Sequence, residues 1–183
     1  VDVRRLPLGT LMDHISMVFQ NVYLFHDTIY NNIAMGRPDA SREEVIEAAK
    51  QARCYDFIMA LPDGFDTMVG EGGANLSGGE RQRISIARCI LKDAPIVILD
   101  EATANVDADN ESYIQEAISS LCRGKTLLVI AHRLNTIFHA DRILVVERGA
   151  IVQAGRHEEL AAQEGVYRRF VAARSGGMGW NRR

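Results

Sequence analysis

The chain has 183 residues, a length that suits one domain with a substantial hydrophobic core. Its formal net charge of −3 and the absence of a long basic run do not indicate nucleic acid as an electrostatic partner. No apolar run approaches the roughly 18 residues of a membrane-spanning helix, no signal peptide opens the chain, and the three cysteines form no CxxC pair, so we expect a soluble chain with buried, reduced thiols.

The first half of the chain combines one short strand with a long helical region. Residues 15–19 (ISMVF) form an apolar run that ends at Gln20 and predicts a strand leading into a loop. From residue 28 to about 91 the patterns are helical, with a capping box that opens at Ser41. The segment LPDGFDT, residues 61–67, interrupts the helical period with proline and glycine.

The second half changes character. Residues 95–100, 126–131 and 142–147 are continuous apolar runs, which are typical of parallel strands covered on both faces by helices. An amphipathic stretch over residues 107–121 separates the first two runs. Strands that alternate with helices at this spacing predict a layered α/β fold.

The C-terminal part is expected to hold a turn, a helix and a flexible tail. Arg148 and Gly149 predict a turn into residues 150–155. A helix is expected over residues 157–174, and the tail over 175–183 is expected to be flexible.

Two adjacent carboxylates follow a predicted buried strand. Asp100 and Glu101 stand where open α/β sheets bind ligands, beyond the carboxyl end of a strand. An aspartate there can hold Mg²⁺, and a second carboxylate can accept a proton from an attacking water. Taken alone, the pair is explained better by a solvated acidic turn than by a functional site.

The segment LSGGERQR, residues 76–83, carries a more specific signal. Ser77 and Glu80 form a capping box at a helix start, where free N–H groups face outward. A capped helix does not require Gly78 and Gly79, each of which costs helix stability, whereas close approach of a phosphate explains both.

The tripeptide Gly124-Lys125-Thr126 looks like the end of a phosphate-binding loop, GxxxxGK[ST]. Ser119 occupies the position of the first glycine, and a strand rather than a helix follows. The sequence therefore favours a polar turn before a strand. His132 and Gln20 each follow a predicted strand as Asp100 does, so the three positions meet at one sheet edge if the strands are parallel.

The motifs LSGGERQR, IVILDEAT and AHR, in this order and spacing, resemble the nucleotide-binding domain of ATP-binding cassette (ABC) transporters, from residue 1 to about 170. The resemblance implies an α/β P-loop NTPase (RecA-like) fold, in which helices flank a mostly parallel sheet. It further implies an α-helical subdomain over about residues 21–91 that carries the signature motif, and a catalytic-core remainder over 1–20 and 92–174.

Site residues carry over from the family one by one. By resemblance, Asp100 is the magnesium aspartate, Glu101 the general base and His132 the switch histidine that contacts the γ-phosphate. Gln20 resembles the Q-loop glutamine, which serves catalysis, contacts the metal and reports occupancy to the membrane domain. The implied nucleotide-binding residues are Ser77, Gly78, Gly79, Gln82 and, in the D-loop, Asp107.

The resemblance is specifically to exporters, through LPDGFDTMVGEGG (61–73) and VYLFHDTIYNNIAMG (22–36). It implies ATP and Mg²⁺ as cofactors. The implied partners are a second nucleotide-binding domain and transmembrane domains at the cytoplasmic face of the cell membrane, without nucleic acid. The D-loop departs from the commoner SALD at residues 104–106, which leaves open whether one site of the dimer is weakened.

The family's adenine loop, Walker A strand, Walker A loop and following helix precede everything in this chain, which opens on Val1 rather than methionine. We therefore expect a truncated domain that binds Mg-ATP poorly by itself, does not hydrolyse it, and exposes an unpaired strand edge.

Three interpretations remain open. The chain belongs to an exporter-type ABC transporter, or to a soluble ABC ATPase that acts on nucleic acid, or it is a non-catalytic module that only dimerises or docks on a membrane domain. The second would call for basic patches or coiled-coil insertions, which the sequence lacks. The absent phosphate loop favours the third for this chain alone.

Overall fold

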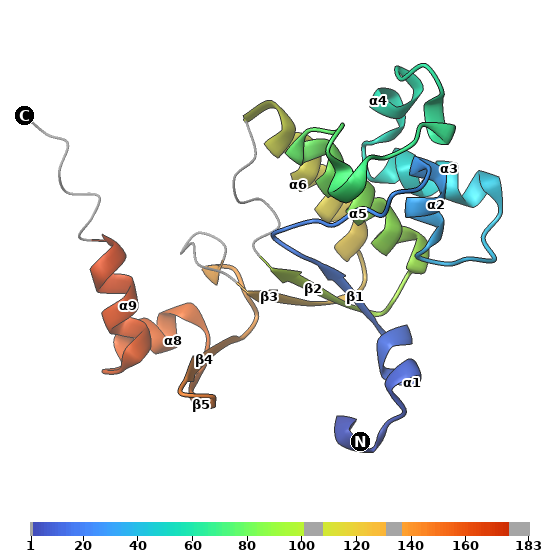
Figure 1. Cartoon of the computed structure of the whole chain (residues 1–183). Helices are drawn as coiled ribbons and strands as arrows, with labels where there is room; N and C mark the ends of the chain where they lie inside the picture. The colour runs from blue at the N-terminus through green and yellow to red at the C-terminus, as the bar shows by residue number, and fades with distance from the viewer. Residues whose placement is uncertain (1, 101–107, 131–136, 176–183) are drawn as a thin grey trace, which may run out of the picture. The chain divides into compact units, whose positions relative to one another are not determined.

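The computed structural model describes residues 2–100, 108–130 and 137–175, and it divides into two compact units at residues 130 and 131 (Figure 1). Unit 1 contains η1 (Val3–Arg5), α1 (Leu8–Asp13), β1 (Ile15–Val18), α2 (Ile29–Ala34), α3 (Arg42–Gln51), α4 (Tyr55–Met59), η2 (Gly64–Asp66), η3 (Glu71–Gly73), α5 (Gly78–Lys92), β2 (Ile96–Asp100), α6 (Ala108–Cys122) and β3 (Thr126–Ile130). Unit 2 contains β4 (Ile143–Glu147), β5 (Ala150–Gly155), α8 (His157–Ala162) and α9 (Val166–Ser175).

The sheet of unit 1 is parallel, with strand order β1-β2-β3. Ile15 pairs with Ile96 at one end of the register, and Asp100 pairs with Ile130 at the other. The parallel pairing predicted for residues 95–100 and 126–131 is confirmed in β2 and β3, and β1 pairs with β2 in the same direction. Their carboxyl ends therefore lie at one edge of the sheet.

Helix α5 is the centre of unit 1. It packs against α2, α3 and α6 and against β1, and Figure 1 shows it among these elements. The side chains of Ile84, Ile86 and Ala87 are fully buried, and they share one apolar core with Val97 and Leu99 of β2. This packing fixes the N-terminus of α5 relative to the sheet.

Capping boxes begin the two longest helices of the first half, as predicted. In α5 the Ser77 hydroxyl accepts from the Glu80 N–H at 3.3 Å, and the Glu80 carboxylate accepts from the Ser77 N–H at 2.7 Å. Ser41 and Glu44 exchange the same pair of bonds at the start of α3. Each box satisfies two N–H groups that the first turn would otherwise leave unpaired.

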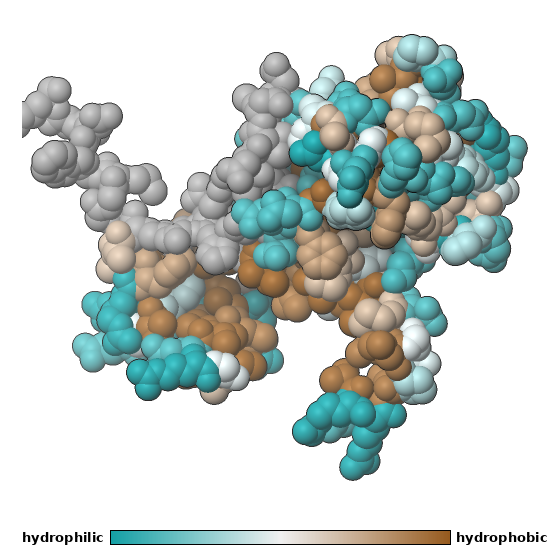
Figure 2. Space-filling view, in the orientation of Figure 1, coloured by the Kyte–Doolittle hydropathy of each residue, from teal (hydrophilic) through white to brown (hydrophobic). Residues whose placement is uncertain are grey.

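The described residues of unit 1 do not cover both faces of strand β3, which corrects the expectation from its apolar run. Leu127, Leu128 and Ile130 are 44%, 48% and 46% exposed. Figure 2 shows apolar surface gathered over the three strands of unit 1. Within the described residues β3 pairs only with β2. An apolar run indicates that its side chains favour burial, but it does not show which other elements are present to bury them.

We expect the chain to self-associate through β3, because an exposed apolar edge strand is a template for further pairing. Size-exclusion chromatography with light scattering should show a mass that rises with protein concentration. Leu128→Lys should reduce the association by placing a charge on this strand, and Met59→Lys, at an exposed position of α4, should not. A well-behaved monomer at every concentration would contradict the expectation.

In unit 2, β4 pairs with β5 in an antiparallel hairpin. The predicted turn at Arg148 and Gly149 is confirmed, with φ of +51° and +79°, the left-handed values that a tight hairpin turn requires. The expectation that residues 142–147 form a parallel strand covered on both faces is wrong for the described residues. Leu144 and Val146 are exposed there, and the partner is the strand that follows the turn.

The helix expected over residues 157–174 is two helices. Gln153 on β5 explains the break, because its Oε1 accepts from the Tyr167 N–H at 3.0 Å and so caps the start of α9. The Gln153 side chain also lies where a Cβ on Gly165 would be, 2.4 Å from its Nε2. A contact from another element therefore sets where α9 begins.

Across the described ranges, no helix combines the length and the apolar character that crossing a bilayer requires.

Candidate nucleotide site

Two predicted site residues lie at the carboxyl edge of the sheet. Gln20 follows β1 and is exposed, and Asp100 is the last residue of β2 and is half-buried. The parallel register of β1 and β2 places both at the same edge, as predicted. Glu101, Asp107 and His132, predicted for the same site, lie outside the described residues.

The glycines of the signature segment have different environments. Gly78 is exposed, and a Cβ built there would meet no atom within 4 Å. Gly79 is buried, and its Cβ would lie 2.6 Å from Cγ of Asn110 on α6. Close packing of α5 on α6 therefore requires Gly79, so the phosphate explanation is needed only for Gly78, whose N–H stands at the open helix start.

We expect the two glycines to respond oppositely to alanine. Gly79→Ala should destabilise the chain, because overpacking costs about 1–3 kcal/mol and the gain in helix propensity offsets at most about 1 kcal/mol. Gly78→Ala should leave the free energy of unfolding unchanged or slightly raise it, since the added methyl enters open space. Urea unfolding of both variants measures the difference. Equal effects at the two positions would contradict the assignment.

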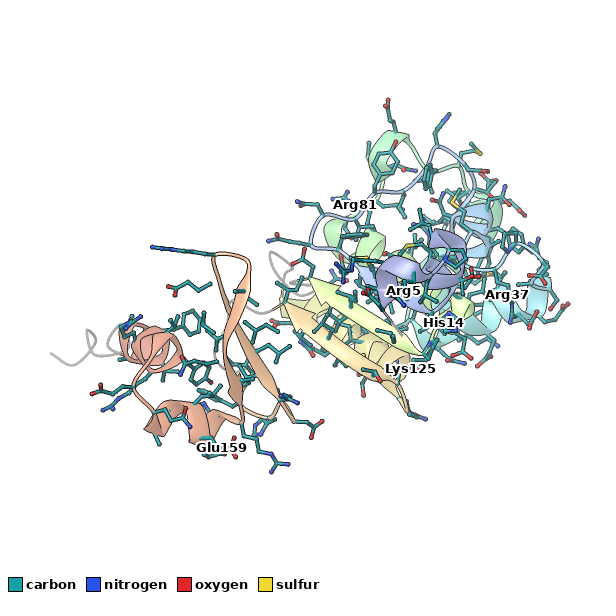
Figure 3. The ribbon with its side chains drawn as sticks, turned by 90° about the horizontal axis from the view of Figure 1, so that it is seen from below. Arg5, His14, Arg37, Arg81, Lys125 and Glu159 are labelled. Atoms are coloured by element: carbon teal, nitrogen blue, oxygen red, sulfur yellow. The ribbon has the colours of Figure 1, made fainter. Side chains whose placement is uncertain are left out.

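The loop before α5 is held by Arg81, which Figure 3 labels. Its Nη1 donates to the Leu76 carbonyl at 2.7 Å and to the Gly73 carbonyl at 3.3 Å. Gly73 has φ +82°, and a Cβ there would lie 2.4 Å from Cδ of Arg81. The guanidinium thus fixes the chain that leads into the Ser77 cap.

Gln82 is 4% exposed, and its Nε2 donates to the carbonyl of Phe19 at 3.4 Å. The side chain therefore links α5 to the residue before Gln20. In the described conformation its amide faces the interior, and this placement supports a contact with the loop after β1 more directly than a contact with nucleotide.

Lys125 lies in a turn between α6 and β3, at the amino end of the strand. Gly124 has φ +71°, and the Lys125 ammonium pairs with the Asp93 carboxylate at 2.9 Å. Figure 3 shows Lys125 at the same end of the sheet as His14, which precedes β1. The Gly-Lys-Thr segment is thus a turn before a strand, as predicted, and no helix N-terminus follows it.

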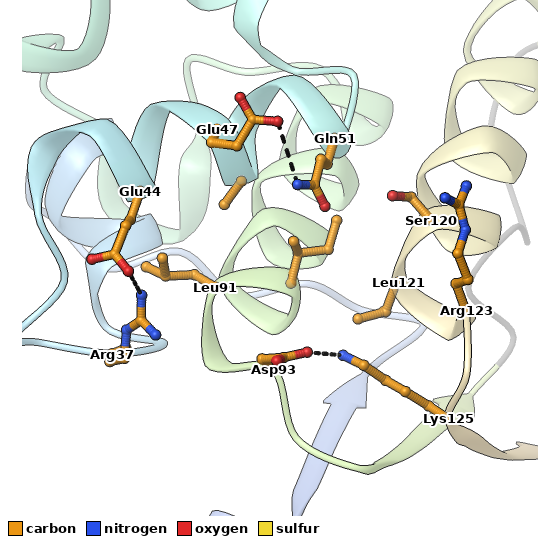
Figure 4. Close-up of a pocket in the computed structure, with 12 residues that line it drawn as sticks. Arg37, Glu44, Glu47, Gln51, Leu91, Asp93, Ser120, Leu121, Arg123 and Lys125 are labelled. Atoms are coloured by element: carbon orange, nitrogen blue, oxygen red, sulfur yellow. Dashed lines mark hydrogen bonds and ion pairs between the residues drawn. The ribbon is translucent and has the colours of Figure 1, made fainter.

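A cavity of about 430 Å³ opens at this amino end (Figure 4). Ion pairs between Arg37 and Glu44 and between Lys125 and Asp93 form part of its wall. Gln20 and Asp100 are at the opposite edge of the sheet, so this cavity is separate from the candidate nucleotide site.

Sequence reasoning missed Asn32, which is fully buried on α2. Its Oδ1 accepts from the Phe25 N–H at 2.9 Å, its Nδ2 donates to the Phe25 carbonyl at 3.0 Å, and Arg88 of α5 donates to the Asn32 carbonyl at 2.8 Å. Burial lowers the pKa of Arg88. Helical spacing, which puts Asn32 beside Ile29 and Ile33, was the available signal.

Two of the three thiols are buried, as expected. Desolvation raises the pKa of Cys54 to about 12 and that of Cys89 to about 11. Cys122 is only partly buried, and desolvation raises its pKa as well. These groups are therefore protonated at neutral pH and unsuited to nucleophilic chemistry.

Comparison with known proteins agrees with the motifs. A family model described as ABC transporter matches residues 2–104, more than half of the chain. An ATP-dependent lipid A-core flippase of Legionella pneumophila (strain Paris) is 57% identical over 165 residues, which cover 90% of this chain and 28% of that protein. The flippase of the same name from Chromohalobacter salexigens is 54% identical over 167 residues, 91% of this chain and 29% of that protein.

A solved structure, that of a bacterial Atm1-family ABC exporter with ATP bound, matches with a TM-score of 0.83 and 42% sequence identity. The match covers 94% of this chain and 30% of the exporter chain. The chain thus spans about 28% to 30% of the length of these relatives. On the family match and on the arrangement of its motifs, the chain belongs to the ABC transporter family.

Proposed function

We propose that this chain is part of the ATP-hydrolysing domain of an exporter-type ABC transporter, in which hydrolysis between two such domains drives transport across the membrane. The observation that carries the proposal is that unit 1 contains both a polar sheet edge and an open helix start. Gln20 and Asp100 stand at one sheet edge, and a capped helix opens at Gly78 with space for a phosphate. The names of the matched relatives, a flippase and an exporter with ATP bound, support it.

Magnesium fits the carboxyl edge. The carboxylate of Asp100 and the amide oxygen of Gln20 are the hard oxygen donors that Mg²⁺ prefers. Within the described residues, no group of three or more His, Cys, Asp or Glu side chains gathers to hold a metal. A site with one carboxylate fits Mg²⁺ carried by a nucleotide, because this ion keeps water and phosphate oxygens in its shell. The ion would offset charge on the phosphates.

Different residues of the chain would then have different roles in ATP hydrolysis. Asp100 would hold the ion, Glu101 would accept the proton of the attacking water, and His132 would donate a hydrogen bond to the terminal phosphate. The Ser77 hydroxyl and the Gly78 N–H would donate to a nucleotide that a second copy of the domain holds, so each chain would serve two sites.

The membrane partner would dock on the loop after Gln20. Tyr23, Phe25, Met35 and Met68 are exposed apolar side chains, and an isolated bridge between Thr28 and Met68 joins the two segments that carry most of them. Such a concentration of exposed apolar side chains is typical of an interaction surface. This partner would place the domain at the cytoplasmic face of the cell membrane.

A second candidate is a non-catalytic module that only dimerises or docks. The observation that favours it is the position of Lys125, whose ammonium pairs with Asp93 at the amino end of the sheet and away from Asp100. ATP hydrolysis by the full-length transporter, compared between the wild type and a Glu101 variant, separates the two functions.

A further inference from the structure

Helix α5 hydrogen-bonds through its side chains to the outer edge of β1, the edge that faces away from β2. Three side chains of the helix donate to three backbone carbonyls of this segment: Lys92 to Ile15 at 2.8 Å, Cys89 to Met17 at 3.4 Å and Gln82 to Phe19 at 3.4 Å. The acceptors are alternate residues of one short segment, and all the donors belong to one helix. The helix and the strand are therefore joined along their length.

The direction of these carbonyls explains why the helix supplies their donors. The His14 carbonyl accepts from the Ile96 N–H of β2 at 3.2 Å. Successive carbonyls of a strand point to opposite sides, so those at positions 15, 17 and 19 face away from β2. Within the described residues β1 pairs only with β2. Side chains of α5 thus satisfy carbonyls that a neighbouring strand would otherwise satisfy.

The spacing of the donors matches the spacing of the acceptors. Positions 89 and 92 are about one turn apart on α5, and positions 82 and 89 are about two turns apart, so all three lie on one face. The rise from residue 82 to residue 92 is about 15 Å along a helix axis, and the rise from residue 15 to residue 19 is about 13 Å along a strand. These contacts therefore set the position of β1 along α5.

The Gln82 contact is the one next to Gln20, a predicted site residue. The carbonyl of Phe19 and the N–H of Gln20 belong to one planar peptide group. A donor that holds this carbonyl also holds the plane from which the chain of Gln20 continues. Gln82 is 4% exposed, and the fully buried Ile84 and Ile86 fix the helix that carries it. The donor is thus part of the rigid core of unit 1.

We propose that Gln82 is a positioning residue for Gln20 and that it acts by holding the peptide group between Phe19 and Gln20. This inference rests on the proposed function, in which the Gln20 amide oxygen contacts the Mg²⁺ of a bound nucleotide. Without the Gln82 donor this peptide group is freer to rotate, so affinity for the metal should fall. If Gln82 instead bound the nucleotide itself, its effect would be independent of Gln20.

The test measures metal binding by the full-length transporter in the presence of a non-hydrolysable ATP analogue. Mn²⁺ is the probe, because it shares the oxygen ligands of Mg²⁺ and its free form is measured by electron paramagnetic resonance. Gln82→Met removes the donor and keeps the length of the side chain. It should raise the Mn²⁺ concentration at half-saturation about 5-fold, the effect of one buried hydrogen bond. Gln20→Ala should raise it at least as much, and the double variant should match Gln20→Ala alone.

Lys92→Met is the matched control, since it removes the donor at the other end of β1 and leaves the Phe19 contact in place. It should lower the midpoint of thermal unfolding without changing Mn²⁺ binding. Gln82→Asn, which withdraws the amide from Phe19 by one methylene, replaces the methionine variant if that variant does not fold.

Three results would overturn the inference: unchanged Mn²⁺ binding by the Gln82 variant, an equal shift in Lys92→Met, or a double variant whose shift is the product of the two single shifts. Wild-type Mn²⁺ binding by Gln20→Ala would instead overturn the metal contact in the proposed function, and this inference with it.

Discussion

Replacement of Glu101 by Gln in the full-length transporter should lower ATP turnover by about 10²- to 10⁴-fold while ATP still binds, because a positioned general base contributes a factor of this size. Glutamine keeps the shape of glutamate but cannot accept the proton of the attacking water. Asp100 precedes it at the end of β2 and would still hold the metal ion, so binding should persist.

Glu111→Gln is the matched control for this experiment, since it makes the same chemical change at a half-buried position of α6 that is not among the predicted site residues. ATPase rate and equilibrium binding of a labelled nucleotide are both measured. Wild-type turnover by the Glu101 variant would remove Glu101 from the role of base. Loss of binding together with turnover would assign it to the nucleotide or metal instead.

Local sequence signals predicted the elements that local interactions fix. The capping boxes at Ser41 and Ser77 use groups three residues apart, and both are present in the structure. The turn at Arg148 and Gly149 depends on the backbone freedom of two residues, and it too is confirmed. Residues 95–100 and 126–131 were predicted to be parallel strands because apolar runs alternate with helical stretches, and β2 and β3 are parallel. Residues 142–147, predicted in the same way, hold the antiparallel strand β4.

Elements that depend on contacts between residues far apart in the sequence could not be predicted in this way. Helix α1 begins after Pro7 and includes Gly9, so its sequence resembles a turn. Lys92 from the end of α5 donates to the carbonyl of Met12 in α1 and to that of Ile15 in β1, both at 2.8 Å. The break at Gly165 likewise depends on Gln153 of β5.

In the candidate site, too, features set by local sequence were predicted and a feature set by a distant residue was not. Gln20, Asp100 and Ser77 were predicted from strand ends and a helix start, and the structure places each there. The reason for Gly79 was not accessible, because it lies in Asn110, a residue 31 positions away. The roles of Glu101, Asp107 and His132 come from the family resemblance, and they remain predictions.

The chain alone is expected to bind Mg-ATP with a Kd weaker than about 1 mM, which corresponds to less than about 4.1 kcal/mol. Lys125 of the Gly-Lys-Thr segment is paired with Asp93 at the amino end of the sheet, opposite the edge that carries Gln20 and Asp100. The helix start at Gly78 offers N–H groups, but an exposed helix terminus contributes only about 0.3–1 kcal/mol toward an anion. Together these groups contribute much less binding free energy than a phosphate-binding loop would.

The measurement that tests the central claim most directly is a calorimetric titration of Mg-ATP into the purified 183-residue chain, with Lys125→Ala titrated in parallel. Absence of binding heat in both would agree with a cassette that supplies the signature and the magnesium aspartate and depends on another segment for the phosphates. Micromolar binding that Lys125→Ala abolishes would contradict the account, because it would make the Gly-Lys-Thr turn the phosphate site.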